Sequence, residues 1–421
     1  MTISKIRITN FKSFADETVE LNDFNLLVGA NASGKSNFVQ AFKFLSDIAT
    51  HGLEDAISLQ GGVEYLRHFG SARNEPLSFQ VTIQGESHMV DRSVDVGTRS
   101  DAKPVRPISI RMPQEIALLD YEFSLRFHRG GSGYFVERDK MTLYHEHESF
   151  TASRKGSSEY AKTVAENSSG KLIVNSTVPN MEYLSSLGGE HIAERTLLFE
   201  TPILFLIAGT FVDWFKEIGI YDFDPKKAKG IITVAGRSEL ETDGGNLAVV
   251  LKNLLSDEDT RRSIRNLCQY NLPYLEDLKI EQLADRFISI KVQESFADGH
   301  ELPAFLISDG TANIIALVVA LFFQKQKRFA IFEEPERHLH PKLISGLMEL
   351  VKEASEKRQI LLTTHNPEVV RYTDIENVLL VSRDKSGFSR IVKPANSQFV
   401  RTFLENDLGV EELFVDNLLG V

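Results

Sequence analysis

A loop at residues 29–36 constrains the fold of this chain more than any other stretch of its sequence. It reads Gly-Ala-Asn-Ala-Ser-Gly-Lys-Ser and follows an apolar run, Phe24–Val28, that predicts a strand. The residues from Gly34 onward predict a helix. Glycines let the backbone N–H groups of such a loop turn inward, and the helix N-terminus adds a favourable dipole for anions. The stretch therefore predicts a strand, loop and helix unit that cradles phosphate groups.

The residue types in this phosphate loop suit a nucleotide. Lys35 is expected to meet the β and γ oxygens, and Ser36 is expected to ligate Mg²⁺. The predicted ATP-binding residues are Gly29, Ala30, Asn31, Ala32, Ser33, Gly34, Lys35, Ser36 and Asn37. In the helix that follows, apolar residues recur at three- and four-residue steps and predict a buried stripe, formed by Phe38, Ala41, Phe42, Leu45 and Ile48.

A pair of carboxylates follows a second apolar strand far along the chain. Phe329–Phe332 predicts a buried strand, and Glu333 and Glu334 come directly after it. Such a strand fixes the two side chains at its carboxyl end, so Glu333 is expected to hold Mg²⁺ and Glu334 to orient and deprotonate the attacking water. The other interpretation, a solvated acidic turn, is weakened by the phosphate loop in the same chain.

Histidines near this strand have two interpretations. His365 follows another apolar strand, Gln359–Thr363, and is expected at the same sheet edge as Glu334, where it could donate to the γ-phosphate. Alone, it would be an ordinary loop histidine. His338 and His340 suggest a zinc site, but residues two apart in an irregular turn need a third convergent ligand that the sequence does not place.

Composition narrows the class of protein. The single cysteine, Cys268, can form neither an intrachain disulfide nor a cysteine metal cluster, which fits a reducing cytoplasm. The first residues alternate polar and apolar side chains, as a strand does and a signal peptide does not. The longest apolar runs, Ala312–Phe323 and Ile203–Val212, are shorter than the roughly 20 residues that cross a bilayer. We expect a cytoplasmic protein without a membrane span, and its net charge of -12 gives no overall attraction for nucleic acid.

Three segments follow from the pattern along the chain. Residues 1–150 predict an ATPase lobe with the phosphate loop and antiparallel strands, including a hairpin of Tyr121–Phe127 with Tyr134–Leu143. Residues 151–300 predict a mobile polar segment, which begins near residue 145, and then a helical insertion. Residues 301–421 alternate helices and strands, which is typical of a parallel sheet. No heptad pattern is long enough for a coiled-coil arm.

Taken together, the motifs resemble the ABC-type ATPase heads of SMC, RecF and OLD proteins. The run Glu-Glu-Pro-Glu-x-His-Leu-His-Pro after the Walker B strand is most similar to OLD-like ATPases. Ile6–Phe14 resembles the first strand of these heads, and Ile307–Thr311 takes the place of their signature loop. The resemblance implies an α/β fold: an ABC-type P-loop ATPase head with a mixed-sheet lobe, a parallel α/β lobe, a helical insertion and no long coiled coil.

The resemblance also implies that two protomers bury two ATP molecules between them. The signature residues Ser308, Asp309, Gly310 and Thr311 would then meet the γ-phosphate held by the other protomer. Leu339–His340 stands for the D-loop, and His365 stands for the switch histidine. The signature reads Ser-Asp-Gly-Thr where these heads have Ser-Gly-Gly-Gln. Their Mg²⁺-sensing glutamine has no clear equivalent, and the candidates are Gln80, Gln84 and Gln114.

Two functions from different classes, and a third with no turnover, follow from this resemblance. OLD nucleases continue into a Toprim nuclease domain, but only about fifty residues follow His365, which are too few for such a domain. We therefore expect a stand-alone ATPase subunit. It would use ATP and Mg²⁺ and form a homodimer or a larger homo-oligomer. It would act as a switch for a separately encoded effector, as in anti-phage defence. The alternative is a DNA-binding repair or recombination ATPase of RecF type, with Lys226, Lys227, Lys229 and Lys325–Arg328 as contacts. The third is a nucleotide-binding scaffold without turnover.

Overall fold

The computed structural model divides the chain into two compact units with interleaved segments. The first unit comprises residues 1–21, 40–216 and 385–389, and the second comprises residues 22–39, 217–384 and 390–421. The described residues are 1–68, 75–87, 92–94, 108–110, 116–128, 133–145, 161–178, 185, 188–189, 191–201, 211–234, 236, 238–324, 326–398, 400 and 409–415. The three segments predicted from sequence, 1–150, 151–300 and 301–421, stay a prediction about the lobes of the ATPase. Each of the two compact units contains residues from all three segments.

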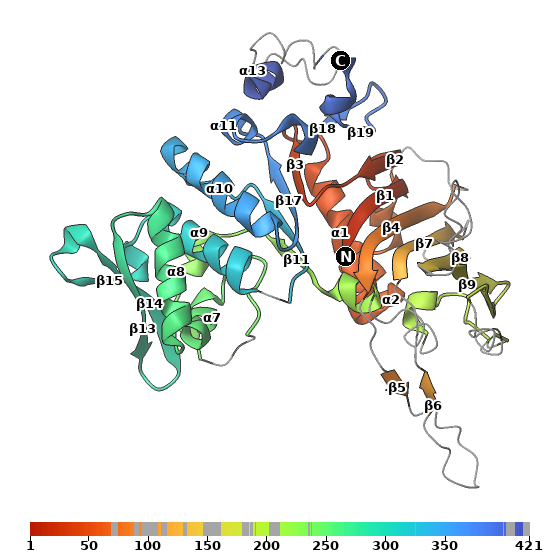
Figure 1. Ribbon diagram of the computed structural model, residues 1–421, viewed down its shortest axis with the longest axis horizontal. Coiled ribbons are helices and arrows are strands. Elements are labelled where there is room, and N and C mark those ends of the chain that lie inside the picture. Colours follow the sequence, from red (N-terminus) through yellow and green to blue (C-terminus); the bar gives the residue numbers. More distant parts are fainter. Residues whose placement is uncertain are drawn as a thin grey trace, which may run out of the picture. The chain divides into compact units, whose positions relative to one another are not determined.

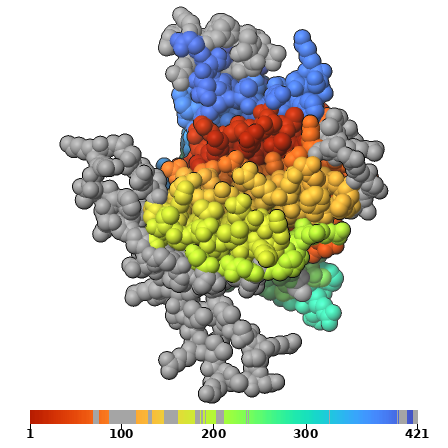
Figure 2. Space-filling view, turned by 90° about the vertical axis from the view of Figure 1, so that its right-hand side faces the viewer, coloured from red at the N-terminus to blue at the C-terminus, as the bar shows by residue number. Residues whose placement is uncertain are grey.

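A seven-stranded antiparallel sheet forms the centre of the first unit, in the order β10-β9-β8-β7-β4-β1-β2 (Figure 1). Its strands are β1 Thr2–Phe11, β2 Phe14–Glu20, β4 Leu77–Ser87, β7 Ile116–Phe127, β8 Tyr134–His145, β9 Ala161–Ser168 and β10 Lys171–Ser176. Figure 2 shows these strands as bands that pass from red through orange and yellow to yellow-green. The pairing of β7 with β8 confirms the predicted hairpin. The two short strands β5 Arg92–Val94 and β6 Ile108–Ile110 pair with each other.

The polar stretch after residue 145 differs from its prediction. Residues 161–176 form β9 and β10, which extend the sheet instead of making a mobile insertion. They do so because every second side chain at the start of β9, beginning with Ala161, is buried, although few of these side chains are large. Residues 146–160 lie outside the described residues. Of the predicted helical stretch Ala193–Ile218, residues 211–216 are helical and residues 202–210 lie outside the described part.

An aromatic cluster forms the core between this sheet and its helices. Phe79 lies at its centre, with ring centroids 5.2 Å from Phe11, 5.5 Å from Phe123 and 5.8 Å from Phe44. Phe44 belongs to α1 Lys35–His51, the helix that follows the phosphate loop. All five residues of the predicted stripe on α1 are buried, which confirms that prediction. Shorter helical segments complete the unit: α2 Leu53–Leu59, α3 Val63–Leu66 and η2 Leu198–Glu200.

The second unit contains a six-stranded sheet in the order β11-β16-β17-β3-β18-β19. Its strands are β3 Phe24–Val28, β11 Ile218–Tyr221, β16 Phe329–Glu333, β17 Gln359–Thr364, β18 Val378–Arg383 and β19 Ser389–Val392. The pairs from β11 through β16, β17 and β3 to β18 are all parallel, as the alternation of helices and strands predicts. Buried parallel strands are mostly apolar, and β3 is buried at all of its residues, of which Asn25 alone is polar.

Helices and a smaller sheet complete the second unit. The helices are α6 Pro225–Ala228, α7 Leu247–Leu254, α8 Glu258–Asn271, α9 Asp309–Val318, the π-helix η5 Val319–Phe323, α10 Ile344–Ser355, α11 Pro367–Arg371 and α13 Val410–Val415. The short 3₁₀ turns are η3 Ser295–Ala297, η4 Ala304–Leu306, η6 Pro341–Leu343, η7 Ile375–Asn377 and η8 Pro394–Asn396. Helices α7 and α8 confirm the helical pattern predicted after Asn246. The second sheet was not predicted: it contains β12 Ile232–Thr233, β13 Leu275–Leu283, β14 Phe287–Glu294 and β15 Glu301–Pro303.

Long helices are missing from the described part of the chain. The longest of its helices, α1, has 17 residues, so these residues contain no coiled-coil arm. The same set includes no helix with the length and apolarity that a membrane crossing requires.

A half-buried arginine, Arg358, fixes the chain where it enters β16. The guanidinium of Arg358 donates to the carbonyl groups of Gln324 and Lys327, both at 3.3 Å, and to that of Ala320. These carbonyls belong to η5 and to the turn before β16, and the end of a helix leaves such acceptors unsatisfied. Burial lowers the pKa of Arg358 to about 10. The side chain therefore holds the start of the strand that ends in Glu333.

We predict that Arg358→Met destabilises the protein. Methionine keeps much of the apolar volume but leaves three carbonyl groups without their charged donor, which should lower the free energy of unfolding by about 2–3 kcal/mol. Urea unfolding followed by circular dichroism measures this difference. Lys357→Met changes an exposed neighbour and serves as the control. Equal stability of the two variants would show that Arg358 does not anchor the strand.

Candidate active site

Three parallel strands bring the predicted motifs to one edge of the six-stranded sheet. β16, β17 and β3 are neighbours and run in the same direction (Figure 1). Glu333, the last residue of β16, is in register with Thr363 of β17, and Thr364 is in register with Val28 of β3. The phosphate loop after β3, the residues after β17 and the Walker B turn, residues 333–340, therefore meet at the carboxyl edge of the sheet, where ligands of such folds bind.

The backbone of the phosphate loop has a shape that requires small residues. A Cβ atom on Gly29 would lie 2.4 Å from the carbonyl oxygen of Val381, so a larger residue would displace β18. Gly34 has a φ of 119°, which favours glycine, and Ala32 has a φ of 62°. Arg383 Nε donates to the carbonyl of Ala32 at 2.9 Å. These contacts hold the loop in its shape.

Lys35 and Ser36 begin helix α1 and point their polar groups into the site. Lys35 Nζ donates to the carbonyl oxygens of Gly29 at 2.7 Å and Ala30 at 3.2 Å. Ser36 Oγ donates to Glu333 Oε2 at 3.0 Å, across 297 positions of the sequence. Burial lowers the pKa of Lys35, and three carboxylates of the Walker B turn oppose that shift. The ammonium group therefore lies in a desolvated surrounding, where the three carboxylates offset only part of the cost of burying its charge.

The two glutamates of the Walker B turn have different surroundings. Burial raises the pKa of Glu333, although the hydrogen bond from Ser36 opposes the shift. Glu334 Oε1 lies 2.8 Å from His365 Nδ1, and the Glu334 N–H donates to the carbonyl of Thr363 at 3.0 Å. Glu334 has a φ of 46°, a left-handed conformation that costs a non-glycine residue about 1–2 kcal/mol. Such strain is typical of functional sites.

Arg337 connects the Walker B turn to the end of strand β11, a contact that the sequence analysis missed. Its Nη2 forms an ion pair with Asp222 and donates to the carbonyl of Glu333 at 3.2 Å. Its Nε lies 3.8 Å from Glu334 Oε2. Glu334 thus lies between an arginine and a histidine. No local pattern indicates this partner, because Asp222 is 115 positions away.

Glu336 is a third acidic residue of the site, also missed from sequence. Its side chain is 5% exposed, and Thr364 Oγ1 donates to one of its carboxyl oxygens. The other oxygen, Oε2, is buried without a hydrogen-bond partner among the described residues. Thr364 Oγ1 in turn accepts from the N–H of Asn366 at 2.9 Å. Burial raises the pKa of Glu336. The carboxyl group therefore positions the segment that carries His365.

The predicted signature residues lie at the N-terminus of α9. Ser308 caps the helix: its Oγ accepts from the N–H of Thr311 at 3.0 Å and lies 2.8 Å from Thr311 Oγ1. Thr311 is buried and its hydroxyl also lies 3.0 Å from Tyr274 Oη, so it positions Ser308 instead of facing outward. Asp309 Oδ1 accepts from Lys229 Nζ at 2.5 Å, and this bond lowers the pKa of Asp309.

Contacts within the chain join the signature to the Walker B turn. A Cβ atom on Gly310 would lie 3.0 Å from the carbonyl oxygen of His338 and 3.5 Å from Leu339 Cδ2. Asn313 is buried, and its Nδ2 donates to two backbone carbonyls of the Walker B turn, at 2.7 and 3.0 Å. Leu339, which was predicted to belong to the D-loop, therefore packs against Gly310 of the signature. Asn313 lies one helical turn after Gly310, and sequence reasoning gave it no role.

Other predicted residues lie elsewhere. Gln80 and Gln84 are on β4 of the first unit, and Gln114 lies outside the described residues. Four of the basic residues considered for DNA form ion pairs with acidic side chains: Lys227 with Asp243, Lys229 with Asp309, Lys327 with Glu239 and Arg328 with Glu217. Lys325 is not among the described residues. These pairs reduce the basic surface that the DNA-binding alternative needs.

Histidine and acidic residues do not gather into a further metal site. Within the described ranges, no group of three or more His, Cys, Asp or Glu side chains is placed to hold a metal ion. His340 Nδ1 instead accepts from the N–H of Lys342 at 3.2 Å, as an N-cap of a short 3₁₀ turn. The side chain therefore has a structural contact at the end of the Walker B turn.

Comparison with known families identifies the chain. A family model described as "AAA domain, putative AbiEii toxin, Type IV TA system" matches residues 121–371, more than half of the chain. The chain belongs to this AAA family. A second model, described as "AAA ATPase domain", matches residues 1–171 of this AAA protein, so its phosphate loop lies in an ATPase domain. The sequence-based prediction of an ABC-type ATPase of the SMC, RecF and OLD group is thereby confirmed.

Individual relatives are distant. The chromosome partition protein Smc of Fusobacterium nucleatum subsp. nucleatum is 29% identical over 108 residues, which are 25% of this AAA chain and 9% of that protein. The match thus spans less than a tenth of that relative. Similar solved structures include an Smc head bound to the C-winged helix domain of ScpA (16% identity, 93% and 98% of the two chains, TM-score 0.49). Another is the SMC head domain from Thermotoga maritima (15% identity, 93% and 99%, TM-score 0.45).

The buried carboxyl of Glu336 predicts a pH-dependent stability. Because its pKa is raised in the folded state, the wild type loses stability as pH rises above the unfolded-state pKa of about 4 and through the folded one. Glu336→Gln keeps an acceptor for Thr364 and has no charge to bury. We expect the variant to gain stability relative to wild type between pH 5 and pH 8, measured by thermal unfolding without nucleotide. Glu353→Gln, on the exposed side of α10, is the control. A difference in stability between Glu336→Gln and wild type that does not change with pH would contradict a raised pKa of Glu336.

Proposed function

We propose that this AAA protein binds ATP with Mg²⁺, hydrolyses it, and acts as a dimerising switch for a separately encoded effector. One observation carries the proposal: three distant segments meet at one sheet edge. Ser36 Oγ lies 3.0 Å from Glu333 Oε2, and Glu334 Oε1 lies 2.8 Å from His365 Nδ1. A phosphate-binding loop, a pair of carboxylates and a histidine in this order are the parts that ATP hydrolysis needs.

The donor set at the site suits Mg²⁺. The hydroxyl of Ser36 and the carboxylate of Glu333 are oxygen donors within hydrogen-bond distance of each other, and Mg²⁺ prefers such ligands together with water and phosphate oxygens. When bound, the ion would neutralise charge on the β and γ phosphates. Two protein side chains would hold it: Ser36 from the phosphate loop, and Glu333 from the end of β16.

Glu334 is the proposed general base. Its two carboxyl oxygens have different neighbours, His365 at 2.8 Å and Arg337 at 3.8 Å, so its orientation is fixed at the sheet edge. One oxygen can accept the proton of the attacking water while His365 steadies the other or donates to the γ-phosphate. Lys35, buried in the loop, supplies positive charge for the phosphate oxygens.

A second copy would complete the site. The N-terminus of α9, a helix of 10 residues, offers Ser308 and the backbone of Gly310, and helix N-termini bind anions. By the resemblance to ABC-type heads, these groups meet the γ-phosphate held by the other protomer. The family description names a putative toxin of a type IV toxin–antitoxin system, which supports a setting such as anti-phage defence.

The first test is hydrolysis. Glu334→Gln removes the base but keeps the shape of the side chain, so phosphate release should fall by about 10²–10³-fold. Lys35→Ala should lose ATP binding as well, and omission of Mg²⁺ should abolish release by the wild type. Glu353→Gln on α10 should keep the wild-type rate. Equal low release by wild type and Glu334→Gln would favour a nucleotide-binding scaffold without turnover.

The second test is dimerisation. With ATP, Glu334→Gln should be trapped closed, and light scattering after gel filtration should show twice the monomer mass of 47.3 kDa. Adding Ser308→Asp keeps a good N-cap for α9 but places a negative charge against the γ-phosphate. This double variant should bind a fluorescent ATP analogue normally and remain monomeric. If Glu334→Gln itself stays monomeric with ATP bound, the switch proposal is wrong.

A further inference from the structure

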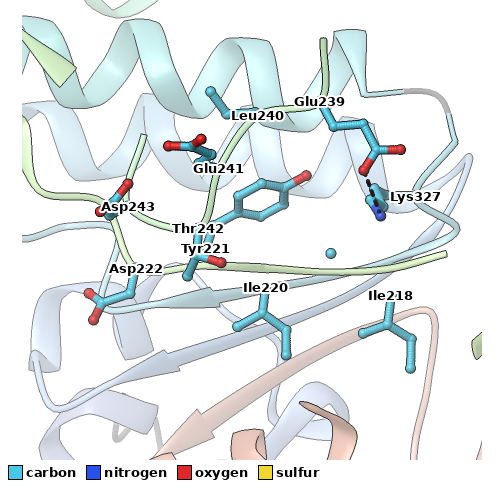
Figure 3. A pocket seen from close by; sticks show the side chains of 11 residues that line it. Ile218, Ile220, Tyr221, Asp222, Glu239, Leu240, Glu241, Thr242, Asp243 and Lys327 are labelled. Carbon is cyan, nitrogen blue, oxygen red and sulfur yellow. Dashed lines mark ion pairs between the residues drawn. The ribbon is translucent and has the colours of Figure 1, made fainter. Parts of the chain in front are cut away.

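A polar pocket of about 610 Å³ lies along strand β11 of the second unit, apart from the phosphate loop (Figure 3). It is formed by β11, by the segment 239–243 and by one side chain before β16. The lining residues are Ile218, Gly219, Ile220, Tyr221, Asp222, Glu239, Leu240, Glu241, Thr242, Asp243 and Lys327. A Cβ atom on Gly219 would lie 3.0 Å from Tyr221 Oη and 3.1 Å from Lys327 Cγ, so the missing side chain leaves part of this space.

The floor of the pocket is the edge of a sheet. β11 is the outermost strand of the six-stranded sheet and pairs only with β16 among the described strands. The segment 239–243 meets the chain just beyond the strand, where the N–H of Asp222 donates to the carbonyl of Thr242 at 2.8 Å. An edge strand offers N–H and C=O groups on its outer side, and extended peptides bind such edges as an added strand. The pocket therefore lies where a peptide backbone can pair.

The lining is acidic. It has four carboxylates and a single basic side chain, Lys327. Asp222, Glu239 and Asp243 each share an ion pair, and each of these pairs is well exposed on at least one side. Exposed ion pairs contribute only about 0–1 kcal/mol, so an incoming cation can exchange with them at little cost. The side chain of Glu241 is exposed and has no ion-pair partner among the described residues. Charge thus favours a basic occupant.

A buried hydroxyl in the pocket wall lacks a partner. Tyr221 is 2% exposed, and its Oη has no hydrogen-bond partner in the described part of the chain. Figure 3 shows its ring between β11 and the segment 239–243, with the hydroxyl toward Glu239 and Lys327. Burying such a group without a hydrogen bond costs about 1–3 kcal/mol. A polar group brought in by a ligand would relieve this cost.

We propose that the pocket binds an extended segment of a partner protein that adds to the edge of β11 and places an arginine or lysine among the four carboxylates. The backbone of the segment pairs with β11, and its basic side chain lies near Glu241 and Asp222. Identification of this segment with the effector rests on the proposed switch function. The binding site itself depends only on the edge strand, the charges and Tyr221.

The pocket is also connected to the active site. Asp222 lines the pocket and pairs with Arg337, whose Nε lies 3.8 Å from Glu334 Oε2. A basic group bound at Asp222 competes with Arg337 for that carboxylate. Arg337 then turns to its remaining carboxylate, Glu334, and would occupy Oε2, the oxygen that His365 leaves free to accept the proton of the water. Occupation of the pocket is therefore expected to slow hydrolysis.

The experiment uses the full chain and a fluorescein-labelled synthetic peptide of alternating valine and arginine. Binding is measured by fluorescence anisotropy, with and without ATP. We expect Glu241→Lys to weaken binding about tenfold or more, because a repulsive charge replaces an attractive one. Glu353→Lys makes the same charge change on α10 and should bind as the wild type does. A peptide with glutamate in place of arginine should not bind.

Further arms distinguish the occupants. A peptide with proline in place of alternate valines cannot pair along an edge strand and should bind at least about tenfold more weakly. Agmatine carries the guanidinium without a backbone; if it binds as tightly as the peptide, the pocket takes a small cation and the proposal is wrong. Equal binding by wild type and Glu241→Lys would also overturn it. Phosphate release measured in the same samples distinguishes the proposed ATPase function from the proposed peptide site. If the wild type hydrolyses ATP but does not bind the peptide, only the peptide site is contradicted.

Discussion

The charge of Lys35 is the constraint on which the site depends. A buried ammonium group is expensive unless groups of opposite polarity surround it, and here two loop carbonyls and three carboxylates do so. The acids incur the same desolvation, which raises the pKa of Glu333 and of Glu336. The phosphate loop and the Walker B turn therefore stabilise each other before any nucleotide binds. Phosphate groups that enter the loop would replace the carbonyls as partners of Lys35.

Local patterns explain why much of this site could be predicted. The loop at 29–36, the glutamates at the end of β16 and His365 each follow an apolar run directly, and parallel strands end at one edge. Arg337, Glu336 and Asn313 could not be assigned roles, because their partners are fixed only by tertiary packing: Asp222, Thr364 and the carbonyls of the Walker B turn. Strands β9, β10, β12 and β15 were missed because they are short or polar, and their pairing across the sheet decides their conformation. Strands β13 and β14 carry apolar residues at alternate positions, a signal that sequence reasoning did not use.

The signature and the Walker B turn form one structural element. Asn313 bonds two carbonyls of the turn, Gly310 packs on His338, and Lys229 holds Asp309 beside Ser308. Both Glu334 and His338 have left-handed backbones, which tolerate few alternatives once these contacts are made. The part of the chain proposed to face a second protomer and the proposed base are thus positioned by the same contacts. A substitution in the signature is therefore expected to shift the position of Glu334, and a substitution in the Walker B turn is expected to shift the signature.

The π-helical turn η5 has a consequence for how such proteins are recognised. A π-helical turn contains one residue more than an α-helical turn, and here it lies between the signature at the start of α9 and the strand that leads to Glu333. A relative could therefore gain or lose one residue between these motifs inside a buried helix, with no loop to mark the change. Arg358, which holds the carbonyls at the end of η5, would still fix the entry to β16. Motif searches that demand a constant spacing here would pass over relatives with the same site.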